Sequence, residues 1–168
     1  LKTVSFDEKL SAIDKYAFYG CDLSTYALSL PSSVENLGAY AFAKTKVEMV
    51  QINKIIEEIA QGTFYGCREL VEVYFANDSA LTCIGDYAFA SSEKLNEISI
   101  PDSVTKIDAN AFRYCTALQE IEIPASVECI GEYAFSDCAS LSSVYFQDTE
   151  NWSAYINEFS YSELNNAT

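Results

Sequence analysis

A short motif recurs along this chain, and its spacing limits what the chain can fold into more than any other feature. An alanine or threonine followed by phenylalanine occurs repeatedly, at intervals of 24, 22, 25, 23 and 23 residues. The phenylalanines are Phe18, Phe42, Phe64, Phe89, Phe112 and Phe135. A fixed period in this range is the signature of a solenoid, in which each repeat buries its apolar side only by stacking on its neighbours. The sequence therefore predicts an array of stacked coils.

Other residue types keep the same frame, so each defines a column, meaning one repeat position followed through successive coils. Aliphatic residues stand five and eight residues before every phenylalanine, and all three prolines of the chain share one column. The columns are Tyr16, Tyr40, Tyr87 and Tyr133, two before phenylalanine; Cys21, Cys67, Cys115 and Cys138, three after; Gly38, Gly85 and Gly131, four before; and Pro31, Pro101 and Pro124, eleven before. Such alignment confirms that the repeat is real.

One unit shows what each coil should contain. Residues Gln119–Ile123 alternate polar and apolar, which is the pattern of a half-buried strand. Pro124 ends that strand because it has no N–H for the ladder. Val127 and Ile130 then point back toward the core, and Gly131 permits a tight corner. Each coil thus has one strand and a return segment.

Equivalent segments predict about seven parallel strands spaced ~4.8 Å apart. We expect a right-handed leucine-rich-repeat solenoid, mainly β, with these strands on its concave side and the extra residues near Ala76–Ala80 forming a surface loop. The strands are 4–6, 27–30, 49–52, 71–75, 96–100, 119–123 and 143–146.

The two ends of the chain are expected to differ. Residues 1–147 form the repeat array, about six repeats, and residues 148–168 form a C-terminal cap and tail of the same domain. Asp148 or Thr149 is a candidate N-cap for a short helix with one apolar face. That face comprises Trp152, Tyr155, Ile156 and Phe159. Because Leu1 has the repeat position of Leu118, the array begins within a unit, and we expect the chain to be a fragment or processed form of a longer protein.

Two stretches of sequence, IPDSVTKIDANAFRYCTALQEIEIP and IPASVECIGEYAFSDCASLSSVYF, resemble the BspA-like leucine-rich repeat family. The resemblance covers essentially the whole chain. It implies a parallel solenoid on secreted or cell-surface proteins, mostly of host-associated bacteria, with roles in adhesion and protein binding. The departures are Thr45 and Ser92 in the cysteine column, Asn53 in the proline column and Gly62 in the tyrosine column.

Composition narrows the function. The net charge of −15 disfavours nucleic acid and anionic lipid, and favours a cationic partner or simply solubility. The chain has no histidine, so serine–histidine–aspartate catalysis is excluded, and with no C-x-x-C pair a zinc site is not expected. No apolar run approaches the ~20 residues of a membrane span. We expect no enzyme activity, no cofactor and no metal.

The outward positions of the strands form the candidate ligand-binding site. Glutamates recur there on neighbouring strands with tyrosines beside them, which makes an acidic patch with aromatic edges, although a solvated sheet face explains the same pattern. The site residues are Met49, Gln51, Glu72, Tyr74, Glu97, Ser99, Glu120, Glu122 and Tyr145. We expect a non-catalytic, monomeric, adhesion-type module that binds a host or neighbouring-cell surface protein. The alternatives are a structural spacer and a carbohydrate-binding module.

Two further columns admit more than one interpretation. Cys115 and Cys138 lie in adjacent coils and are candidates for a disulfide, but evenly spaced cysteines in a core column are typical of buried free thiols. The tyrosine column is typical of a packing ladder between coils. A sugar-binding stripe instead requires those tyrosines to be exposed together.

Overall fold

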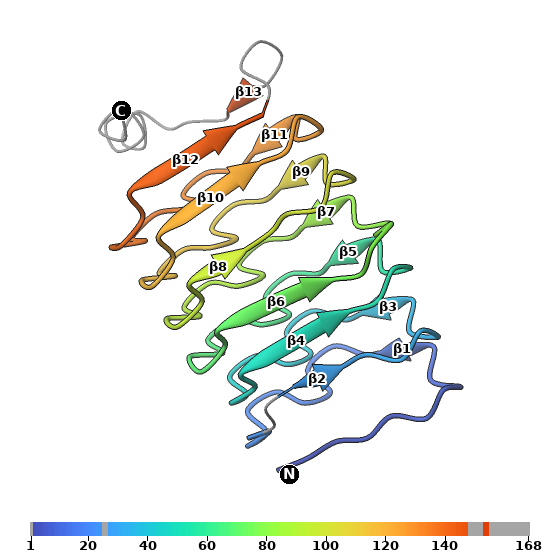
Figure 1. Ribbon diagram of the computed structural model, residues 1–168. Helices are drawn as coiled ribbons and strands as arrows, with labels where there is room; N and C mark the ends of the chain where they lie inside the picture. Colours follow the sequence, from blue (N-terminus) through green and yellow to red (C-terminus); the bar gives the residue numbers. More distant parts are fainter. Residues whose placement is uncertain (1, 25–26, 148–152, 155–168) are drawn as a thin grey trace.

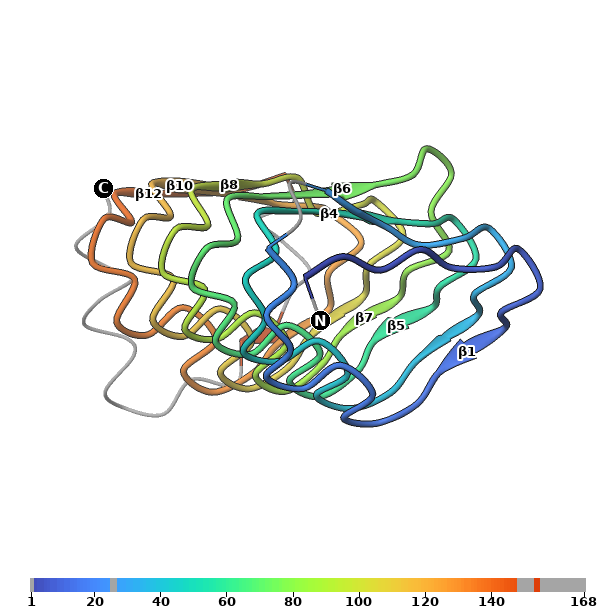
Figure 2. The same ribbon diagram turned by 90° about the horizontal axis from the view of Figure 1, so that it is seen from below.

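The structure, a computed structural model, describes residues 2–24, 27–147 and 153–154. The chain winds into a stack of similar coils, so that segments one repeat apart lie side by side (Figure 1). Successive coils contribute a strand of two or four residues to one side of the stack and a two-residue strand to the other side (Figure 2). The expected parallel solenoid is confirmed.

The side that contains all of the four-residue strands forms what we call the long-strand face. All of their pairings are parallel, as expected for coils that wind in one direction. Their inward residues, such as Val50 and Val73, are buried, whereas the residues between them point outward. The strands are β2 (Leu28–Ser29), β4 (Met49–Ile52), β6 (Glu72–Phe75), β8 (Glu97–Ile98), β10 (Glu120–Ile123) and β12 (Ser143–Phe146).

A second set of strands, which the sequence pattern did not predict, lies opposite. Each has two residues, usually an exposed residue followed by the aliphatic residue five before phenylalanine. The set comprises β1 (Ala12–Ile13), β3 (Asn36–Leu37), β5 (Glu58–Ile59), β7 (Cys83–Ile84), β9 (Lys106–Ile107), β11 (Cys129–Ile130) and β13 (Ser153–Ala154). Parallel pairing joins β5, β7, β9, β11 and β13 in one ladder and β1 with β3 in another.

Two expectations about the ends need correction. Residues 4–6 form no strand, because their backbone is not paired with β2 in a ladder. Ser153–Ala154 fall within the expected C-terminal helix but extend the ladder from β11, which satisfies their backbone groups in a different way. The cap residues Asp148, Thr149, Trp152, Tyr155, Ile156 and Phe159 lie outside the described residues. The loop that follows β6 does project from the coils, with Asp78 in the left-handed conformation at φ 55° (Figure 2).

The phenylalanine column forms the spine of the core. Phe42, Phe64, Phe89 and Phe112 are fully buried, and consecutive rings stack with centroids 5.2–5.7 Å apart. Their planes differ by at most 12°. The aliphatic columns pack around this stack. The motif that reveals the repeat in the sequence is therefore also the main packing contact between coils.

The turns around each phenylalanine use two left-handed residues, one two positions before it and one two positions after it. Their φ angles lie between 56° and 68°. Glycine adopts this conformation without strain, so Gly62 in the tyrosine column keeps the turn while it loses the ring. The residues are Tyr16, Tyr40, Gly62, Tyr87, Asn110 and Tyr133 before phenylalanine, and Gly20, Lys44, Gly66, Ser91, Tyr114 and Asp137 after it.

Candidate functional site

The long-strand face brings the candidate residues together in the expected columns. Glu72 lies between Met49 and Glu97 in the ladder, and Tyr74 lies beside Gln51. Side chains at seven of the candidate positions are exposed, whereas Met49 and Glu72 are partly buried. The exposed ones are Gln51, Tyr74, Glu97, Ser99, Glu120, Glu122 and Tyr145. The two outward columns thus form one continuous surface.

The ladder of the long-strand face is interrupted once between β4 and β12, at the contact between β8 and β10. These strands are neighbours, but each belongs to a different hydrogen-bonded sheet. A surface hollow with a volume of about 280 Å³ lies at this interruption. Its walls include Glu97, Ser99, Glu120, Glu122, Tyr145 and Gln147. Five of the nine candidate residues therefore line one concavity, whose position periodicity alone does not reveal.

Gln147 is a site residue that the sequence pattern did not indicate. Its amide Nε2 donates a hydrogen bond of 2.9 Å to Glu122, and its side chain lines the hollow. Its repeat position could have indicated this role. Gln147 follows Pro124 by one repeat of 23 residues and comes directly after β12. A polar residue in the proline column at a strand end is a candidate for such a contact.

The negative charge of this face has little compensation. Neither outward column contains lysine or arginine. The ion pairs of the described residues lie elsewhere, for example between Lys46 and Asp22 at 2.8 Å on the turns near phenylalanine. Within the face, the Tyr74 hydroxyl donates to Glu72 at 2.6 Å, which orients that carboxylate without neutralising it. The face presents carboxylates, two tyrosines and two amides to solvent.

A model of the BspA type leucine-rich repeat region matches residues 1–116 and 82–168, with six copies of the repeat. The chain belongs to the BspA-type leucine-rich repeat family. The resemblance noted from the repeat units is thereby confirmed. Among curated proteins, none matches the chain.

Solved structures of bacterial leucine-rich repeat proteins share the fold of this chain. One from T. pallidum is 27% identical, with a TM-score of 0.79, over 92% of this chain and 77% of that chain. One from Bacteroides ovatus is 26% identical, with a TM-score of 0.55, over 94% of this chain and 54% of that one. A leucine-rich cell surface protein from Faecalibacterium prausnitzii is 21% identical, with a TM-score of 0.53, over 89% and 55% respectively. The last of these shows the fold alone.

The cysteine column of this BspA-type array has a structural role. Cys67, Cys115 and Cys138 are buried, and each thiol donates a hydrogen bond of 3.1–3.3 Å to the carbonyl of the phenylalanine one coil earlier. Ser92 makes the same bond with its hydroxyl, so this departure keeps a donor at the position. Thr45 instead bonds the carbonyl of Phe42 in its own coil.

The cysteines of the described part are all free thiols, including Cys115 and Cys138. Burial raises the pKa of Cys67 to about 11 and that of Cys138 to about 12. Burial also raises the pKa of Cys83 to about 12, and the nearby Asp108 carboxylate adds to the effect. Because the thiolate is the reactive form, these side chains are poor nucleophiles at neutral pH.

Asn53, the departure from the proline column, connects two coils. Its Nδ2 donates to the carbonyls of Pro31 and Val34 at 2.6 and 2.8 Å. In other coils a serine bonds the equivalent carbonyl, as Ser126 does to Val104 at 2.7 Å. In the coil of Phe64, the residue at the repeat position of Ser126 is Ile55, which has no side-chain donor. Asn53 supplies the missing donor. The departure thus compensates for a second substitution nearby.

The tyrosine column shows stacking, as in a packing ladder, and also exposure to solvent. Tyr16 and Tyr40 stack with centroids 5.4 Å apart, as in a packing ladder. Yet Tyr16 and Tyr133 are 54% and 37% exposed. In the described part, the column therefore lies at the surface and forms a ladder between Tyr16 and Tyr40, and Gly62 and Asn110 interrupt it further along.

The described residues contain no group of three or more histidine, cysteine, aspartate or glutamate side chains with the geometry to hold a metal ion. In the same part of the chain, no helix has the length and apolar character needed to cross a bilayer.

Proposed function

We propose that this BspA-type array is a non-catalytic, protein-binding module of a secreted or cell-surface bacterial protein, and that the long-strand face binds a basic partner. The observation that carries the proposal is the hollow between β8 and β10, where Glu97, Glu120 and Glu122 line one concavity beside Tyr145. A concave, acidic surface with an aromatic edge suits an extended cationic side chain.

Electrostatics support this assignment. Glu72 and Glu97 are direct partners in a parallel ladder, where like charges destabilise the sheet. Each such exposed contact costs under ~1 kcal/mol in water and less at physiological salt. Lysine or arginine from a partner relieves this repulsion on binding. The glutamates therefore favour the complex more than they favour the free protein.

The family and one of the structural neighbours support the proposed location. The T. pallidum and Bacteroides ovatus proteins are leucine-rich repeat proteins, and the Faecalibacterium prausnitzii protein is described as a cell surface protein. A repeat scaffold exposed to host tissue or to neighbouring cells meets many protein surfaces. A solenoid suits that role because it presents a long, rigid face.

A pull-down tests the proposal. The immobilised chain is exposed to host cell-surface extract at low and moderate salt, in parallel with a Glu97→Lys/Glu120→Lys variant. We expect the wild type to capture partners that the variant loses, with capture weakening as salt rises. A Glu35→Lys/Glu58→Lys variant is the matched control, because it changes the net charge equally on the opposite side of the coils.

The control variant distinguishes binding at the long-strand face from a general response to the net charge of the chain. Loss of capture in both variants indicates a response to net charge alone and contradicts a specific face. Retention by the Glu97→Lys/Glu120→Lys variant moves the binding site away from the long-strand face. Capture of no partner by any form favours a structural spacer instead.

A further inference from the structure

A row of aromatic rings runs along the turns of the first four coils, away from the long-strand face. Tyr16 and Tyr40 stack with planes 6° apart. Tyr65 lies across the row, with its ring at 77° to Tyr40 and at 80° to Tyr87. Centroid distances between neighbours are 5.4–6.4 Å. We call Tyr16, Tyr40, Tyr65 and Tyr87 the tyrosine ridge.

Tyr65 belongs to the ridge although it comes from a different column. In its coil the usual tyrosine position is Gly62, where an added Cβ would lie 2.3 Å from the ring of Tyr40. Tyr65, one residue after the phenylalanine, therefore supplies the ring of that coil. Because the ring of Tyr65 is nearly perpendicular to the rings of Tyr40 and Tyr87, it is not stacked face to face on either of them.

Two coils after Tyr65, the guanidinium of Arg113 occupies the repeat position that Tyr65 has in its own coil. The tyrosine position there is Asn110. The Arg113 guanidinium lies over the ring of Tyr114 at 4.8 Å and over the ring of Tyr133 at 5.8 Å. The position that holds a tyrosine in one coil thus holds an arginine in another.

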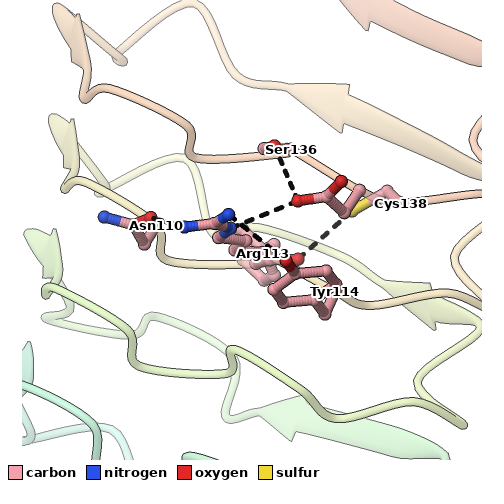
Figure 3. A network of polar contacts seen from close by, with 7 residues as sticks. Asn110, Arg113, Tyr114, Ser136 and Cys138 are labelled. Carbon is pink, nitrogen blue, oxygen red and sulfur yellow. Dashed lines mark hydrogen bonds and ion pairs between the residues drawn. The ribbon is translucent and has the colours of Figure 1, made fainter.

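Polar contacts hold Arg113 among these rings (Figure 3). Its Nε donates to Asp137 at 3.2 Å, and one terminal nitrogen donates to the Asn110 amide oxygen at 3.4 Å. The arrangement combines two aromatic rings near the guanidinium with a carboxylate, which is a favourable environment for a planar cation. The chain therefore contains an occupied example of an arginine site on its own tyrosines.

The tyrosine ridge has similar components without the arginine. Tyr65 is partly exposed, and within the described residues no lysine or arginine lies over its ring. Lys44 lies over Tyr19 instead, at 5.3 Å. Asp86 lies next to the ridge, because its backbone carbonyl accepts a hydrogen bond of 2.8 Å from the N–H of Gly62. An acidic residue, Asp86, is thus a backbone neighbour of the coil that carries Tyr65.

We propose that the tyrosine ridge is a second binding surface, which receives an arginine side chain from an extended segment of a protein partner against Tyr65. The net charge of −15 favours such a segment electrostatically. Arginine is preferred over lysine because its planar, weakly hydrated guanidinium stacks on aromatic rings. This site is independent of Glu97 and Glu120, which lie on the long-strand face.

Titration calorimetry with two synthetic peptides tests the proposal. One alternates arginine with glycine, and the other alternates lysine with glycine at the same length and charge. We expect the wild type to bind the arginine peptide at least roughly threefold more tightly. A Tyr65→Leu variant should lose this preference, whereas Tyr65→Phe, which keeps an aromatic face, should retain it. A Tyr87→Leu variant checks the neighbouring ring and should reduce the preference.

The outcomes separate this site from the long-strand face. The Glu97→Lys/Glu120→Lys variant should bind both peptides more weakly yet keep the preference for arginine. Equal affinity of the wild type for the two peptides overturns the proposal. So does a preference that survives in a Tyr65→Leu variant with the same melting temperature as the wild type.

Discussion

Replacing Phe89 with alanine is expected to lower the free energy of unfolding by about 3 to 5 kcal/mol. Phe89 is fully buried and stacks on Phe64 at 5.6 Å and on Phe112 at 5.4 Å. Truncation removes its own burial and also leaves a cavity between two coils. Urea unfolding followed by circular dichroism measures the loss.

Phe135→Ala is the control for this prediction. Phe135 is only partly buried and, among the described residues, stacks on the single neighbour Phe112. We expect a clearly smaller loss, because water reaches part of the site and one coil contact is removed, not two. Equal losses for the two variants contradict a core that is held together by the stacked column.

Gly131→Ala is expected to destabilise the fold by about 1 to 3 kcal/mol, although it adds only a methyl group. Its φ is not in the left-handed region, so the conformational freedom that the sequence suggested is not the reason for glycine here. The reason is close approach. A Cβ at this position would lie 2.4 Å from the backbone nitrogen of Ala109 and 2.6 Å from the carbonyl carbon of Asp108.

Gly20→Ala distinguishes crowding from strain. Gly20 has φ 66°, but no heavy atom lies within 4 Å of the position of an added Cβ. The cost there is conformational alone, about 1 kcal/mol. Thermal melts of the two variants therefore rank Gly131→Ala as the less stable. The opposite ranking contradicts the tight contact between adjacent coils.

The repeat and its strands were predictable because stacking forces equivalent residues into equivalent environments. A buried position such as Phe89 tolerates few residue types, so its column is visible in the sequence. The same logic located Glu72, Glu97 and Glu120 on one face, since alternation in a strand fixes which side chains point outward. These expectations required only periodicity.

Features that depend on backbone detail were not predictable. Two-residue strands such as Cys83–Ile84 are too short for a pattern of alternation. The interruption between β8 and β10 arises in strands whose sequences, NEISI and QEIEI, look equivalent. Tyr65 joins the tyrosine ridge from another column, because the reach of its side chain and not its repeat position decides the contact.

If the glutamates of the long-strand face serve binding and not folding, as we propose, their replacement should leave the fold intact. Urea unfolding of the Glu97→Lys/Glu120→Lys variant beside the wild type measures this. Because reversal of Glu97 replaces repulsion from Glu72 by attraction, we expect a free energy of unfolding that is unchanged or higher by up to about 1 kcal/mol. A clear loss of stability would show that these carboxylates support the fold, and would contradict the proposal.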